Sequence, residues 1–206
     1  MLALTFGLMM SPLYSTAMSW DAVRPALHRE RPQDPAPTPT HRHFSSPCVH
    51  AQRLEFAEFC TRCGVKCQVK CLTLNALGIE PGKVDQYPSL QSYIFNASAV
   101  KSFTIFLAHK LGSDPDLQHN EYLRIRHIAV WTAVEISRVC DHAQIALSDA
   151  ECARLQWATS LHLLCFAWLH HRTSHLYLYK PVPKLHYLEH CIQCCATWCV
   201  NPNVWR

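Results

Sequence analysis

Two apolar stripes at helical spacing, separated by a strong helix-start signal, constrain the fold of this chain more than any other feature. Residues 148–151 are Ser-Asp-Ala-Glu, a capping box in which a hydroxyl and a carboxylate each meet a free backbone amide at a helix start. The apolar residues before this signal predict a helix ending at about His142, and those after it predict one ending at about His171. Because only a few residues join them, the two helices should run antiparallel. We expect their facing sides to bury Trp131, Leu155, Leu161, Leu164 and Trp168 together.

The same spacing predicts three further helices. They cover residues 48–77 with Gly78 as the C-terminal cap, residues 90–111 with Gly112 as the cap, and residues 184–199. The helix that ends at His142 should begin at Asp114 and Pro115, because these residue types favour the N-cap and the first helical position. With 5 glycines against 13 prolines and no persistent alternation of apolar and polar residues, the chain does not favour a sheet. The prediction is a mostly α-helical bundle of about five helices.

The first quarter of the chain differs in composition from the rest. Residues 1–19 are largely apolar and could act as a signal peptide, but no Lys or Arg precedes the apolar run. Residues 20–47 are rich in proline and should form an extended, disordered arm. Residues 48–206 make up the predicted helical domain, and its ordered part should begin near residue 50. No apolar run reaches the roughly 18 residues that a membrane-spanning helix needs, so we expect no transmembrane segment.

The 12 cysteines are the first candidates for chemistry. Cys60 and Cys63 are spaced as one half of a zinc site, and Cys191 and Cys194 could supply the other half. The loop between the two halves would be far longer than usual. Moreover, the first two share an apolar helical stripe with two later cysteines, and on such a stripe cysteine packs as a small apolar residue. We favour core packing over zinc or disulfides and commit no residue as a metal ligand.

His186 and His190 are the second candidates, because a spacing of four places both imidazoles on one helical face. Histidines at this spacing hold zinc in many metalloproteases. In those helices the catalytic Glu follows the first histidine, whereas Glu189 directly precedes the second, so a protease of this type is disfavoured. We favour the interpretation in which both histidines hydrogen-bond and pack against neighbouring helices.

The last segment of the chain carries a pattern of known type, KPVPKLHYLEH at residues 180–190 followed by NPNVW at residues 201–205. Pro181 and Pro183 bias the chain toward extended geometry before a helix that carries the two histidines. This pattern resembles the K-P-K-x-H-x-x-x-H segment near the end of the catalytic region in DDE-type transposases. It is most similar to transposon-derived proteins in which an Asn-Pro-x-x-Trp turn follows.

The resemblance implies DNA and divalent metal as ancestral partners. It also implies a metal-binding carboxylate after the Trp of the turn, whereas the sequence ends at Arg206. Acidic residues such as Asp114, Asp141, Asp149 and Glu151 occupy predicted helix ends and caps, so no catalytic residue is carried over. We expect a transposon-derived, catalytically incompetent protein resembling the helical part of a DDE-type transposase.

Two other classes of function fit the residues. One is a helical protein-interaction module stabilised by zinc or thiol clusters, and the other is a small secreted helical protein with disulfides. The net charge of +4 permits contact with phosphate backbones without implying it. The poor match to a signal peptide favours a nuclear or cytoplasmic location over secretion. The residues themselves identify no partner.

Overall fold

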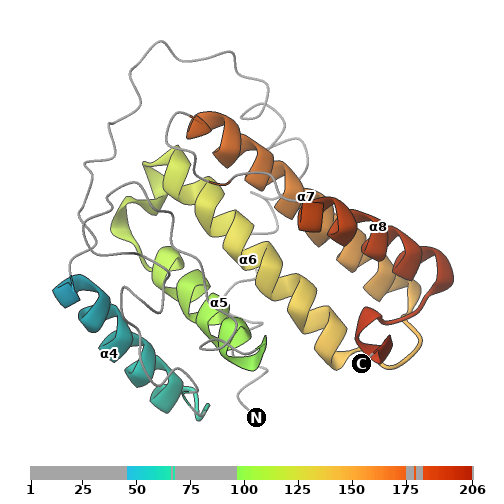
Figure 1. Ribbon diagram of the computed structural model, residues 1–206, viewed down its shortest axis with the longest axis horizontal. Helices are drawn as coiled ribbons and strands as arrows, with labels where there is room; N and C mark the ends of the chain where they lie inside the picture. The colour runs from blue at the N-terminus through green and yellow to red at the C-terminus, as the bar shows by residue number, and fades with distance from the viewer. Residues whose placement is uncertain (1–45, 66, 68–96, 175–178, 180–182, 206) are drawn as a thin grey trace. The chain divides into compact units, whose positions relative to one another are not determined.

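In the computed structural model, residues 46–65, 67, 97–174, 179 and 183–205 are described. Within them the chain forms five α-helices and no β-strand, which confirms the predicted mostly α-helical bundle (Figure 1). The helices are α4 (Ser46–Arg62), α5 (Ala97–Gly112), α6 (Glu121–His142), α7 (Asp149–Arg172) and α8 (Pro183–Trp198). Two 3₁₀ turns are η2 (Pro115–Gln118) and η4 (Pro202–Trp205). The predicted segment 1–19, nearly all of the predicted arm 20–47, and Gly78 lie outside the described residues.

Helices α6 and α7 form the predicted antiparallel pair, lying side by side (Figure 1). The capping box starts α7 as expected. Ser148 Oγ accepts a hydrogen bond from the Glu151 amide at 3.3 Å, and the Glu151 carboxylate accepts one from the Ser148 amide at 2.8 Å. On the facing sides, the His162 ring nitrogen Nδ1 lies 2.9 Å from the Ala129 carbonyl oxygen of α6. This contact brings a side chain of α7 to the backbone of α6.

The described side chains pack into two apolar clusters. The first joins α4 to α5 and contains Phe56, Phe59, Cys60, Ala99, Phe103 and Phe106. Phe56 and Phe103 meet edge to face with ring centroids 5.2 Å apart, an arrangement that aromatic pairs favour. The second joins the end of α6, the start of α7 and α8, and contains Val139, Cys140, Leu147, Cys152, Leu155, Ile192 and Cys195. α8 is therefore held against the α6–α7 pair by one apolar face.

The predicted first helix is wrong in length, because α4 ends at Arg62 and not at residue 77. Gly64 adopts a positive φ of 65°, a conformation that glycine adopts without steric cost. The amide of Val65 then bonds the Cys60 carbonyl at 2.9 Å, and the amide of Gly64 bonds the Thr61 carbonyl at 3.2 Å. These two bonds are the pair that closes a Schellman motif. Gly64, and not Gly78, therefore ends this helix.

The start of α6 also differs from the prediction. Asp114 is an N-cap, but its side chain caps the short turn η2 by accepting from the Asp116 amide. α6 itself begins at Glu121, where the Asn120 side chain accepts from the Leu123 amide at 3.2 Å. The predicted single element is thus a 3₁₀ turn followed by a separate helix. The end of α6 at His142 agrees with the prediction.

The set expected to be buried between α6 and α7 is partly right. Leu155 and Leu161 are buried, with 0% and 7% of their surface exposed. Trp131, Leu164 and Trp168 are only half-buried. Because two closely packed helices leave little width between them, a large ring is accommodated more easily at the margin of the contact. Several buried positions on the two helices are held by small residues, among them Ala129, Thr132 and Ala158.

Gly112 allows α5 to approach α6 closely. A Cβ at this position would lie 3.1 Å from the Nε2 atom of the buried His127 ring. That separation is tighter than ordinary van der Waals contact, so a larger residue would displace the ring. Gly112, predicted as a cap after the helix, is instead the last residue of α5 and serves packing between helices.

We predict that Leu155→Ala lowers the free energy of unfolding by about 2–5 kcal/mol, because it empties a fully buried site. Chemical denaturation followed by circular dichroism measures the change. The neighbouring exposed position provides the control, since Gln156→Ala should change stability by less than about 0.5 kcal/mol. A loss below about 1 kcal/mol for Leu155→Ala would contradict the α6–α7 packing.

Candidate functional site

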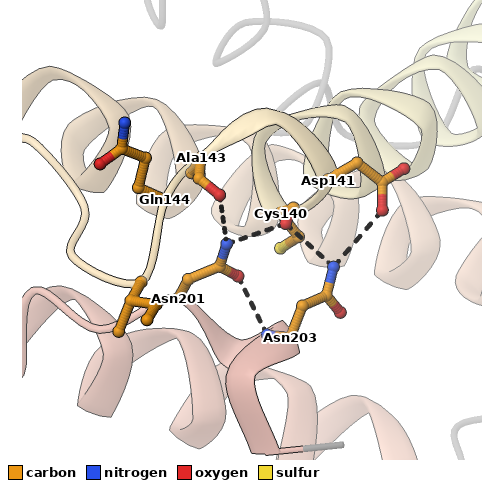
Figure 2. Close-up of a pocket in the computed structure, with 7 residues that line it drawn as sticks. Cys140, Asp141, Ala143, Gln144, Asn201 and Asn203 are labelled. Atoms are coloured by element: carbon orange, nitrogen blue, oxygen red, sulfur yellow. Dashed lines mark hydrogen bonds between the residues drawn. The ribbon is translucent and has the colours of Figure 1, made fainter.

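An open pocket of about 420 Å³ lies at the end of α6, where the C-terminal turn meets the helix (Figure 2). The lining residues come from α6, from the joint that follows it and from η4 and the residue before it: Cys140, Asp141, Ala143, Gln144, Ile145, Asn201 and Asn203. This end of α6 is a natural place for polar groups, since the last four carbonyls of a helix have no partner within the helix. The turn belongs to the NPNVW pattern of the sequence.

Asn201 binds these carbonyls directly. Its buried amide nitrogen donates to the Cys140 carbonyl at 2.9 Å and to the Ala143 carbonyl at 3.0 Å. Its amide oxygen accepts from the backbone N–H of Asn203 at 2.9 Å. One side chain thus satisfies two helix-end acceptors and also orients the following turn (Figure 2).

Asn203 and Asp141 complete the polar network. The Asn203 amide nitrogen donates to the Cys140 carbonyl at 2.9 Å and lies 3.4 Å from the Asp141 carboxylate. Lys101 of α5 donates to both oxygens of that carboxylate at 2.6 Å. Asp141 is therefore engaged in an ion pair, and the asparagine cap (Asn201 and Asn203) anchors the chain end onto α6. Its hydrogen bonds are those of a structural anchor.

Sequence reasoning located the NPNVW pattern but did not foresee this role. Two asparagines around Pro202, just after a predicted helix, were the available signal, because asparagine amides often bond nearby backbone groups. The acceptors of the Asn201 amide lie 61 and 58 residues earlier, so no local pattern could identify them.

Cys60 and Cys63 lie in the apolar cluster between α4 and α5, as the core interpretation expected. Burial, together with the neighbouring thiols of Cys67 and Cys63, raises the pKa of Cys60 to about 11. The raised pKa means that the thiol stays neutral at pH 7, and only 1% of Cys60 is exposed. Cys60 therefore behaves as a core residue.

Cys191 and Cys194 have exposed side chains on α8, whereas the next residue, Cys195, is buried. Burial and the nearby thiol of Cys191 raise the pKa of Cys195 to about 12. Among the described residues, no three His, Cys, Asp or Glu side chains are gathered as metal ligands. The zinc site that would combine Cys191 and Cys194 with Cys60 and Cys63 is therefore not assembled among the described residues.

His186 and His190 share one exposed face of α8. Their Nε2 atoms are 3.0 Å apart and their ring centroids 4.3 Å apart, so one imidazole can donate a hydrogen bond to the other. The expectation that both pack against neighbouring helices is wrong, because both side chains are exposed. The two histidines do form a hydrogen bond, and it joins them to each other.

Glu135 is a buried acid that sequence reasoning missed. Only 6% of its side chain is exposed, and its carboxylate meets Arg138 of the same helix at 2.7 Å and Arg154 of α7 at 2.5 Å. The hydrogen bond to Glu135 raises the pKa of Arg138. A buried carboxylate needs such partners, because leaving it unpaired costs several kcal/mol. The two ion pairs compensate the burial of this charged residue at the α6–α7 interface.

No family model, curated protein or solved structure matches the chain. Among the described residues, no helix combines the length and the apolar character needed to cross a bilayer.

We predict that Asn201→Ala lowers the free energy of unfolding by about 1–3 kcal/mol, because it removes both hydrogen bonds that the Asn201 amide nitrogen donates to the end of α6. Thermal and chemical denaturation measure the loss. Gln144→Ala, an exposed change in the same pocket, is the matched control and should have little effect. Equal stability of the two variants would show that the cap does not hold the chain end.

The buried His127 and the partly buried His162 predict a pH dependence of stability. Burial lowers the pKa of His127 and of His162 from the ordinary 6.5, and a backbone hydrogen bond opposes this only in part. A lowered pKa means that the unfolded chain binds protons more readily than the folded one. Stability should therefore be complete above pH 6.5 and decline as the pH falls from there toward the lowered values.

Melting temperatures between about pH 7.5 and 5.0 measure this decline. His162→Gln should make the decline shallower, because it removes one of the two groups. His119→Gln, at an exposed histidine, is the control and should leave the slope unchanged. A slope that is unaffected by His162→Gln would exclude this histidine as a source.

Proposed function

We propose that this chain is a transposon-derived protein whose helical domain acts as a self-associating interaction module, and not as a nuclease. The transposon origin rests on the resemblance of residues 180–205 to the histidine segment and Asn-Pro-x-x-Trp turn of DDE-type transposase relatives. The interaction role rests on one observation about α8, which presents an exposed stripe of aromatic and cysteine side chains beside its packed face.

The acidic residues support the non-catalytic part of the proposal. Metal-dependent cleavage of a phosphodiester needs two or three carboxylates free to bind divalent ions. Asp114 and Glu151 cap helix starts, Asp141 is paired with Lys101, and Glu135 is paired with two arginines. Each of these carboxylates already has a structural role.

The two faces of α8 support the interaction part. Ile192 and Cys195 are buried against the rest of the domain. On the outer face, Tyr187 and Trp198 are 69% and 75% exposed, and Cys191 and Cys194 are exposed between them. Large aromatic side chains are costly to leave in water, and exposed ones often mark protein contacts. We call these four residues the outer stripe.

The spacing of the outer stripe indicates that its partner is a second copy of the same helix. Its members follow one another at intervals of four, three and four residues, which is the seam spacing of a coiled coil. None of the four is charged. The order aromatic, cysteine, cysteine, aromatic is symmetric about its centre. In an antiparallel pair, Tyr187 of each copy therefore faces Trp198 of the other, and Cys191 faces Cys194. Such a self-complementary patch suits a two-fold dimer.

We predict that the purified chain is a dimer and that Trp198→Glu makes it a monomer, because a charge on the seam must be desolvated in the dimer. Sedimentation equilibrium measures the mass. Leu54→Glu places the same charge at an exposed leucine on α4 and should leave the dimer intact.

Oxidative cross-linking tests the antiparallel geometry in the same samples. Diamide takes up two hydrogen atoms as two thiols join in a disulfide, and it should link the copies through Cys191 and Cys194. Either Cys191→Ser or Cys194→Ser should abolish the link, whereas Cys63→Ser should not. A monomeric wild-type chain, or links that persist in both single variants, would refute self-association through the outer stripe.

Metal-dependent cleavage of DNA would refute the non-catalytic role.

A further inference from the structure

His186 and His190 form a geometric unit that neither the fold nor the proposed dimer requires. The two residues lie one turn apart on α8 with both side chains exposed, and their Nε2 atoms approach to 3.0 Å. The rings are inclined to each other by 78° with centroids 4.3 Å apart. The same nitrogen of both imidazoles is therefore directed toward one small region of space.

This separation agrees with two ligands of one metal ion. Imidazole nitrogen binds late first-row divalent ions at about 2.0–2.1 Å. At such bond lengths, a nitrogen–nitrogen distance of 3.0 Å corresponds to a ligand angle of roughly 90°. A tetrahedral ion would need nitrogens about 3.4 Å apart. Adjacent corners of a square-planar or octahedral ion fit better, and imidazole suits Ni²⁺ and Cu²⁺ in these geometries.

We propose that His186 and His190 form a two-imidazole binding site for a divalent late first-row ion of square-planar or octahedral preference, such as Ni²⁺ or Cu²⁺. The ion takes the place of the hydrogen bond between the rings. Because no third His, Cys, Asp or Glu joins the pair among the described residues, water or a group from another molecule fills the other positions.

The packing of α8 prepares this site before the metal arrives. Ile192 and Cys195 are buried on the inner face, and Cys195 lies only five residues beyond His190. The helix that carries both imidazoles is therefore held by the core and by the asparagine cap that follows it. When one imidazole has bound, the second is already at the required distance, so the two act together. The site does not depend on dimer formation, because both ligands belong to one helix.

The test uses the full chain and Ni²⁺ as the probe, because Cu²⁺ would also oxidise thiols. Isothermal titration of the chain, with its exposed thiols alkylated beforehand, should show a site that His186→Ala or His190→Ala weakens roughly tenfold or more. His119→Ala removes an exposed histidine elsewhere and should leave the affinity unchanged. Circular dichroism should confirm that helix content is the same in all variants.

A rearranged pair separates geometry from histidine number. The double variant His190→Ala/Cys191→His keeps two imidazoles on α8 but turns the second away from the first, since five residues do not bring side chains to one helical face. It should bind Ni²⁺ as weakly as His190→Ala alone. Wild-type affinity in the rearranged variant, or in His186→Ala/His190→Ala, would overturn the proposal.

Discussion

The packing of α6 against α7 is the interaction on which the rest of the described domain depends. α5 and η2 pack on α6, and α8 packs on α7, while η4 contacts both α6 and α8. The pair can come close because small residues such as Ala129, Thr132 and Ala158 are buried on the two helices. Close packing of this kind gives many dispersion contacts between the helices. A change in the volume of a buried side chain there should therefore destabilise the pair. Half-buried tryptophans at the margin are a consequence of the same geometry.

The buried negative charge of Glu135 is paired with positive groups of the same two helices. The Glu135 carboxylate lies at the α6–α7 interface with a guanidinium group from each helix, and the His162 ring bonds the α6 backbone. Polar groups buried in this way stabilise one specific arrangement of the two helices more than others, because a shift would leave them without partners. The apolar core and the polar contacts therefore favour the same alignment.

The last helix carries three distinct sets of side chains in 16 residues. Its inner face completes the second apolar cluster, its outer stripe has the composition and spacing of a helix-pairing seam, and its histidine pair has the spacing of a metal ligand set. After α8 the chain returns to the end of α6, where the Asn201 side chain bonds the Cys140 carbonyl. α8 is therefore held both by its inner face and by the turn that follows it. A helix that is held rigidly on one side is a suitable platform for binding on the other.

The sequence by itself determined the features that depend on neighbours within a turn or two of the chain. The capping box at Ser148, the extents of α7 and α8, and the apolar face of α4 and α5 were all predictable, since helix spacing and caps are local. Only the tertiary structure decided the rest. Asn201 binds carbonyls that lie 61 and 58 residues away. Glu135 is buried because Arg154 comes to it from another helix. These outcomes depend on which distant groups meet, and a linear pattern does not contain that information.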